Sequence, residues 1–203
     1  MRAAGTGADA LARQRVANLP NLLTAFRILL IPVFVVVLLN PGREAAIVAA
    51  LLFFLACWSD FLDGYLARRH GITTPLGKLL DPLADKLIVM AALVMLAAMT
   101  REPRVPAWMV VLIVGRELAV TGLRAIALGE GILLAAEELG KYKMIFQMFA
   151  LHGLLLHYRF LGVDFHAAGM YFLWISVVVG LWSGVDYHIR VIRHASEARA
   201  RLF

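Results

Sequence analysis

The chain has 203 residues, of which 62% are hydrophobic, and it carries a formal net charge of +6. Soluble domains are about 45–50% apolar, so this composition argues against a water-soluble globule and predicts a single membrane domain over residues 1–203. Its basic residues are then expected in cytoplasmic loops near anionic lipid, and nucleic-acid binding is not expected. With a single cysteine, Cys57, the chain can form neither an intramolecular disulfide nor a cysteine-based zinc cluster.

The N-terminal residues 1–21 are predicted to be a cytoplasmic juxtamembrane segment. They contain several charged side chains and no continuous apolar stretch, so they do not have the pattern of a cleaved signal peptide. Within them, residues 10–18 (ALARQRVAN) are predicted to form a short amphipathic helix at the membrane surface.

Six apolar segments follow, and each approaches the roughly 20 residues that a helix needs to cross a bilayer. Segments containing proline or glycine separate them. The predicted fold is therefore an all-α, polytopic bundle of six transmembrane helices with an N-terminal surface helix. The expected spans are residues 22–39, 45–67, 79–99, 106–128, 142–157 and 168–190.

The distribution of lysine and arginine predicts the orientation. Twelve of them lie in segments on the side of both termini, and four lie on the opposite side. Cytoplasmic loops carry the excess of basic residues, so both termini are expected in the cytoplasm. The remaining four basic residues fall inside the spans: Arg27, Lys86, Arg116 and Arg124.

Four carboxylates lie close together in sequence, at the ends of two of these apolar segments. Asp60 and Asp63 are three residues apart, and Asp81 and Asp85 are four apart, so each pair shares one face of a helix. Carboxylates at membrane depth are costly and usually functional. Two such pairs brought together would offer an oxygen-rich site for one or two Mg²⁺ or Mn²⁺ ions.

The basic residues inside the spans suggest a second site. Arg27 lies six residues into the first span, where it should face a polar cavity rather than lipid. A cationic pocket for a phosphate-bearing substrate could be built by Arg116, Arg124, Lys141 and Lys143. Ion pairing with Glu117, or simple extension of the arginines toward the interface, is the alternative for this group.

The region around the aspartates matches a family signature. It reads D-x2-D-G-x2-A-R-x8-G-x3-D-x3-D, with fixed positions at Asp60, Asp63, Gly64, Ala67, Arg68, Gly77, Asp81 and Asp85. In this the chain resembles the CDP-alcohol phosphotransferase family, whose members are integral-membrane enzymes.

This resemblance implies roles for the signature residues. The four aspartates would hold two metal ions, and Asp85 would also act as the catalytic base. The cytidine nucleotide would bind at Gly64, Ala67, Arg68 and Gly77. Asn21 and Thr24, at the start of the first span, either contact the nucleotide or, in the case of Asn21, cap the helix.

Three flanking stretches, PNLLTAFRILLIP, RELAVTGLR and GKYKMIFQM, resemble bacterial family members whose acceptor is sn-glycerol 3-phosphate. The resemblance implies a homodimer in the bacterial inner membrane that transfers the phosphatidyl group of CDP-diacylglycerol to glycerol 3-phosphate. Inositol 1-phosphate, phosphatidylglycerol (as in a cardiolipin synthase) and serine are alternative acceptors, although a phosphate pocket disfavours serine. A cation transporter is the alternative from another class, and the nucleotide-site residues Arg68 and Gly77 disfavour it.

Overall fold

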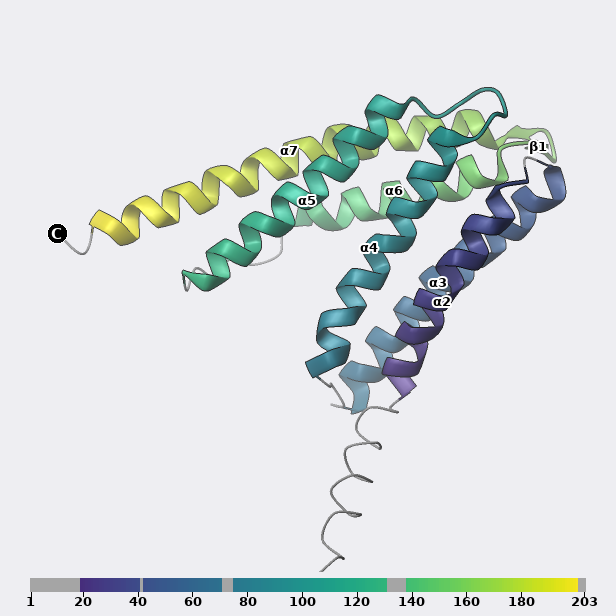
Figure 1. The fold of residues 1–203 in the computed structure, drawn as a ribbon. Coiled ribbons are helices and arrows are strands. Elements are labelled where there is room, and N and C mark those ends of the chain that lie inside the picture. The colour runs from purple at the N-terminus through teal and green to yellow at the C-terminus, as the bar shows by residue number, and fades with distance from the viewer. Residues whose placement is uncertain (1–18, 41, 71–74, 131–137, 201–203) are drawn as a thin grey trace, which may run out of the picture. The chain divides into compact units, whose positions relative to one another are not determined.

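A computed structural model describes residues 19–40, 42–70, 75–130 and 138–200. The surface helix expected at residues 10–18 lies outside these ranges. The chain falls into two compact units, Met1–Met95 and Leu96–Phe203. Within the described ranges the helices are α2 (Leu19–Leu38), α3 (Arg43–His70), α4 (Pro75–Ala98), α5 (Ala107–Gly129), α6 (Glu138–Leu156) and α7 (Phe165–Ala200) (Figure 1).

The all-α class is confirmed, and each predicted span corresponds to one helix. The largest departure is α7, which continues to Ala200 although its apolar stretch was expected to end near residue 190. Loss of hydrophobicity marks where a helix leaves lipid, whereas the helix itself ends only where its backbone hydrogen bonds end. The extension is supported by an ion pair one turn apart, between Arg190 and Asp186.

A short hairpin between α6 and α7 was not predicted. Its strands are β1 (Arg159–Phe160) and β2 (Val163–Asp164), which pair antiparallel. The two residues between them, Leu161 and Gly162, have φ values of 50° and 81°. Positive φ at both positions is the geometry of a type I′ turn, which matches the twist of paired strands.

Within the described ranges, one helical stretch, Phe165–His194, is long and apolar enough to cross a membrane by length and composition; Leu22–Leu38 is apolar but shorter. Helix α5 has the length, but Arg116, Glu117 and Arg124 lie within it. Six membrane-crossing helices are therefore not established by the helices alone.

In the first unit, α2 packs against α3. The buried face of α3 consists mostly of alanines, including Ala46, Ala49 and Ala56, which let α2 approach closely. Phe34 of α2 and Phe53 of α3 fill the contact with their ring centroids 6.2 Å apart.

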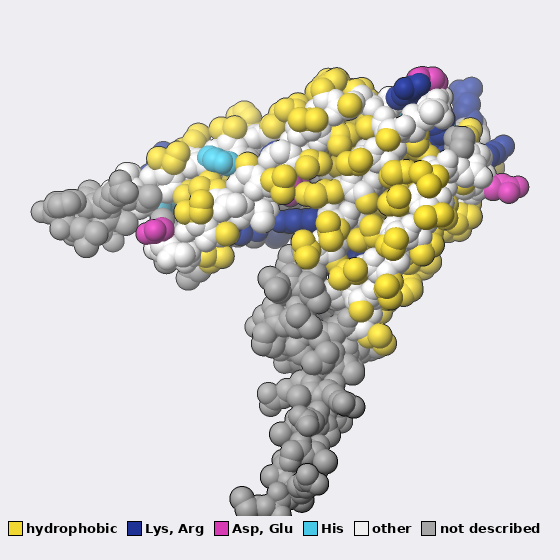
Figure 2. Space-filling view, viewed as in Figure 1, with side chains coloured by type: hydrophobic (Ala, Val, Ile, Leu, Met, Phe, Trp, Pro, Cys, Tyr) yellow, Lys and Arg dark blue, Asp and Glu magenta, His cyan; other side chains and the backbone are white. Residues whose placement is uncertain are grey.

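Helix α2 is apolar on both faces, and its described polar side chains lie on the buried one, together with Leu30 and Phe34. Thr24 and Arg27 are completely buried, whereas Leu29 and Val36 are 70% and 66% exposed. A surface helix of a water-soluble protein would instead carry polar side chains on its outer face. Figure 2 shows hydrophobic side chains spread over the visible surface of the described helices. This pattern is typical of helices whose outer faces contact lipid.

In the second unit, α7 lies along both α5 and α6. It passes close to α6 at two facing glycines, Gly153 and Gly169. A β-carbon added to Gly169 would lie 2.7 Å from the backbone nitrogen of Leu154 and 2.9 Å from the carbonyl oxygen of Ala150. Only glycine therefore allows the two backbones to pass at this distance.

We expect Gly169→Ala to destabilise the protein by about 1–3 kcal/mol, because the added methyl group meets backbone that cannot rotate away. The matched control is Gly122→Ala on α5, where an added β-carbon meets nothing within 4 Å. Thermal unfolding in detergent should show a lower midpoint for the first variant only. Equal midpoints would contradict the close crossing.

The segment before α5 is tied to the end of α6. Arg101 Nη2 donates to the carbonyl oxygens of Leu154 and Leu155, at 3.2 and 3.3 Å, and so satisfies carbonyls of the last helical turn. His157 Nε2 lies 3.2 Å from the carbonyl oxygen of Glu102. Because a carbonyl only accepts, this nitrogen carries the proton, and His157 Nδ1 accepts from His166 Nδ1 at 3.1 Å.

This arrangement requires neutral imidazoles. Burial, reinforced by the nearby Arg101 guanidinium, lowers the pKa of His157 from its ordinary value of 6.5. The unfolded chain therefore binds more protons than the folded chain at pH values just below 6.5, and the free energy of unfolding decreases as the pH falls through that range.

We accordingly expect the unfolding midpoint to be lower at pH 5.5 than at pH 7.5, and His157→Asn to reduce that difference. Asparagine removes the titrating ring and tolerates the φ of 59° at this position. The control is His194→Asn, which replaces an exposed histidine outside this contact. An undiminished difference in His157→Asn would show that this histidine is not responsible.

Candidate functional site

In the first unit, the described part of the predicted site is an ion pair between α2 and α3. Arg27 Nη1 lies 3.0 Å from Asp60 Oδ1; the arginine side chain is 1% exposed and the aspartate 39%. The pair confirms that Arg27 faces inward rather than toward lipid. The exposure of Asp60 leaves its carboxylate accessible to a ligand.

Thr24 lies one turn before Arg27 on the same buried face of α2. Asp85, on α4, is partly buried. The Cys57 thiol on α3 is within electrostatic reach of both Asp60 and Asp85. The first and last aspartates of the signature therefore both lie near Cys57 in this unit.

The remaining signature positions lie in the last turns of α3 and the first turns of α4, where the structure describes the course of the helix but not the side chains. Among the residues that are described, no group of three or more His, Cys, Asp and Glu could hold a metal ion. The four-aspartate metal site and the nucleotide site thus stay predictions. The predicted site residues for which only the course of the helix is described are Asn21, Asp63, Gly64, Ala67, Arg68, Gly77 and Asp81.

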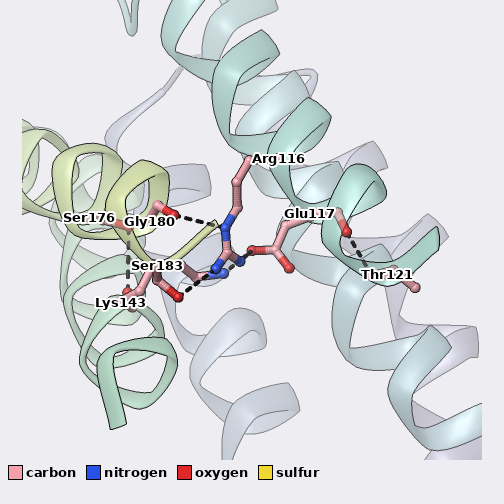
Figure 3. Close-up of polar contacts among 7 residues, drawn as sticks. All are labelled: Arg116, Glu117, Thr121, Lys143, Ser176, Gly180 and Ser183. Atoms are coloured by element: carbon pink, nitrogen blue, oxygen red, sulfur yellow. Dashed lines mark hydrogen bonds and ion pairs between the residues drawn. The ribbon is translucent and has the colours of Figure 1, made fainter. Parts of the chain in front are cut away.

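The second unit brings together two of the four residues expected at the acceptor phosphate. Arg116 Nη1 donates to Glu117 Oε1 at 2.8 Å, and Lys143 Nζ donates to the same oxygen (Figure 3). All three side chains are 18% exposed or less. We call these three residues the α5–α6 charge cluster. Two cations share one carboxylate, so the cluster has a net charge of +1.

Helix α7 closes one side of this cluster. Arg116 Nε donates to the carbonyl oxygen of Gly180 at 2.9 Å, and its Nη2 donates to Ser183 Oγ at 3.1 Å. A β-carbon on Gly180 would lie 3.3 Å from the Lys143 side chain, and one on Gly184 would lie 3.2 Å from that of Arg116. These two glycines, one turn apart, make room for the two long side chains.

The other two expected acceptor residues are placed differently. Arg124 is exposed, and its guanidinium carbon lies 5.6 Å from the centre of the buried Tyr187 ring. Lys141 is also exposed, at the start of α6. Arg124 follows Arg116 by eight residues on α5, so it is more than two turns away along the helix.

Gln147 and Ser176 were not singled out from the sequence. Both are buried, and both line a small cavity together with Arg116, Glu117 and Lys143. A possible signal was the run of small residues at Ser176, Gly180 and Ser183, whose spacing of four and three places them along one side of a helix.

Comparison with known proteins identifies the family. Residues 17–182 match the model of the CDP-alcohol phosphatidyltransferase family. The match covers most of the chain, including the aspartate signature, the α5–α6 charge cluster and most of the apolar part of α7. The chain belongs to this family, and it is a transferase.

Several curated relatives carry one specific name. A Bacillus subtilis protein named CDP-diacylglycerol–glycerol-3-phosphate 3-phosphatidyltransferase is 44% identical over 183 residues, which cover 84% of this chain and 93% of the relative. A Haemophilus influenzae protein of the same name is 37% identical, covering 84% and 91%. One from Rickettsia felis is 36% identical, covering 84% and 93%.

Proposed function

We propose that this protein transfers the phosphatidyl group of CDP-diacylglycerol to sn-glycerol 3-phosphate, giving phosphatidylglycerophosphate and CMP. The observation that carries the proposal is the 44% identity, over 84% of the chain, to a bacterial protein named for this reaction. A buried cluster with a net positive charge supports an acceptor that itself carries a phosphate.

The nucleotide and the diphosphate are assigned to the first unit. In this proposal Arg68 binds phosphate oxygens, and Asn21, Thr24, Gly64, Ala67 and Gly77 contact the nucleotide. The four aspartates, Asp60, Asp63, Asp81 and Asp85, fit a divalent ion because they offer only oxygen ligands. Bound there, Mg²⁺ or Mn²⁺ would neutralise the diphosphate and polarise the phosphorus under attack.

The reaction needs a base for the acceptor and no covalent enzyme intermediate. Asp85 takes the proton from the free primary hydroxyl of glycerol 3-phosphate. The hydroxyl oxygen forms a bond to the phosphorus that carries diacylglycerol, and the bond from that phosphorus to the oxygen of CMP breaks. CMP leaves with the bonding electron pair. Asp60, paired with Arg27 in the fold, keeps its charge throughout.

The acceptor phosphate is assigned to the second unit. Arg116 and Lys143 supply the buried positive charge of this site. The exposed Arg124 and Lys141 attract the acceptor from the aqueous side. Arg116 already makes three hydrogen bonds to protein groups, so it holds a fixed position instead of reaching out to the ligand. A fixed guanidinium loses little conformational entropy when a phosphate binds.

The test is CMP release by the purified protein with CDP-diacylglycerol and each of four acceptors: glycerol 3-phosphate, inositol 1-phosphate, phosphatidylglycerol and serine. We expect glycerol 3-phosphate to give the highest kcat/KM, and chelation of divalent metal to stop the reaction. Asp63→Asn and Asp81→Asn should each abolish release, because a neutral amide is a poor ligand for a hard cation.

Asp186→Asn is the control for these two variants, since Asp186 pairs with Arg190 on the exposed side of α7 and lies outside the signature. It should retain full activity. A preference for one of the other three acceptors would refute the acceptor assignment. Full activity of both Asp63→Asn and Asp81→Asn would refute the aspartate site.

The finer membrane arrangement also belongs to this proposal. All six helices cross the bacterial cytoplasmic membrane, both termini and the aspartate signature lie on the cytoplasmic side, and the protein is a homodimer. Support comes from the apolar outer face and buried charge of α2, from the span Phe165–His194, and from the twelve-to-four distribution of basic residues.

Orientation can be tested by labelling single cysteines in a Cys57→Ala background. Cysteines at Arg43 or Arg159 should react with an impermeant reagent added to intact cells. Cysteines at Arg69 or Arg199 should react only after the membrane is opened. Labelling of position 69 from outside would reverse the proposed orientation and place the signature away from cytoplasmic substrates.

A further inference from the structure

The α5–α6 charge cluster borders a cavity that neither the sequence nor the comparisons assign. Arg116, Glu117 and Lys143 contribute to its wall, and Ser176 and Gly180 of α7 complete one side. The cavity has a volume of about 10 Å³, close to the smallest that holds one water molecule. It therefore admits one oxygen-sized atom.

Gln147 lines this cavity from α6, one turn after Lys143. It is 5% exposed, and its amide nitrogen Nε2 has no hydrogen-bond partner in the described part of the chain. A buried N–H group without an acceptor is costly, by about 1–3 kcal/mol. An amide donor kept in this position therefore indicates a ligand that accepts a hydrogen bond.

The charges around the cavity restrict that ligand further. Two cations and one carboxylate leave a net charge of +1, and both cations donate to the same oxygen of Glu117. A metal cation would be repelled by this surplus. A neutral or negatively charged oxygen atom satisfies both the free amide donor and the local charge.

We propose that this cavity is the inner end of the acceptor-phosphate site. Gln147 donates to one phosphate oxygen, or to the water that takes its place when no acceptor is bound, and Glu117 is the positioning residue that holds Lys143 and Arg116 beside it. The inference rests on the proposed function for the identity of the acceptor. Its structural basis is the unpartnered amide beside the shared carboxylate.

Glu117 has a positioning role because the two cations would otherwise repel each other. One of its oxygens, Oε1, accepts from both the Lys143 ammonium and the Arg116 guanidinium, while Gly180 and Ser183 fix the arginine from the other side. Replacing the carboxylate by an amide raises the net charge to +2 but removes the strongest acceptor. If Glu117 only offsets charge, its replacement by glutamine should strengthen phosphate binding. If Glu117 positions the two cations, the same replacement should weaken phosphate binding.

The first experiment compares Michaelis constants. Gln147→Leu should raise KM for glycerol 3-phosphate roughly tenfold, the size expected for one hydrogen bond to a charged group, and leave KM for CDP-diacylglycerol nearly unchanged. Met144→Leu, on the exposed face of the same helix, is the control. If Gln147→Leu does not fold, Gln147→Met keeps the chain length without the amide and should show the same shift.

Glu117→Gln separates the positioning role from simple neutralisation. KM for glycerol 3-phosphate should rise although the site has become more positive. A fall in KM would show that Glu117 only offsets charge, and would overturn the positioning role.

The second experiment uses inorganic phosphate as the probe and does not depend on which acceptor is natural. Phosphate should raise the thermal unfolding midpoint of the wild-type protein and should do so more weakly in Gln147→Leu. If Gln147 holds only a structural water, the variant will respond to phosphate and glycerol 3-phosphate as the wild type does, and the inference fails. Turnover with another acceptor but not glycerol 3-phosphate would refute the proposed function alone.

Discussion

Two ion-pair sites whose cations are buried impose the strongest constraint on this molecule, Arg27–Asp60 in the first unit and Arg116–Glu117–Lys143 in the second. An unpaired charge away from water is far more costly than a paired one. Each helix that carries one of these residues must therefore turn that face inward. The rest of its surface is then left to apolar side chains, which is why Leu29 and Val36 are exposed on the helix that buries Arg27. The rotation of each helix thus follows from its charges at least as much as from its hydrophobic residues.

Buried ion pairs are in general a weak source of stability for packed helices. Replacing a buried ion pair by packed apolar residues is often neutral or even stabilising. The glycines that accommodate the cluster add a further cost, since glycine lowers helix stability by about 1 kcal/mol relative to alanine. Helix α7 nevertheless has Gly180 and Gly184 where Lys143 and Arg116 pass. An arrangement that sacrifices stability at several positions around one point is typical of a binding site, and this supports reading the cluster as functional.

The hydrophobic pattern predicted the helices because six apolar segments with proline and glycine between them leave few other solutions. It could not predict where α7 ends or that Leu161 and Gly162 form a turn, since neither depends on hydrophobicity. For the site, the sequence left two alternatives to a cationic pocket: ion pairing of Arg116 with Glu117, or extension of the arginines toward the interface. The structure shows that the ion pair forms. The place of Gln147 in the site was not predictable. Its amide lines the cavity only because residues of α5 and α7 complete the wall, and the sequence does not show this packing. Asp63 and Asp81 remain predictions from the sequence alone.

The proposed function gives the two units different chemical roles, and this has a consequence for acceptor choice. In the proposed function the aspartates of residues 60–85 handle the bond that breaks, a step common to every CDP-linked alcohol transfer. The residues of α5, α6 and α7 handle only the group that the acceptor brings. A cavity with room for one oxygen atom, an amide donor without a partner among the described residues and a net charge of +1 suit the end of a phosphate and offer little to an uncharged alcohol. Acceptor choice can therefore change through side chains around Lys143 and Gln147 without altering the chemistry at the aspartates.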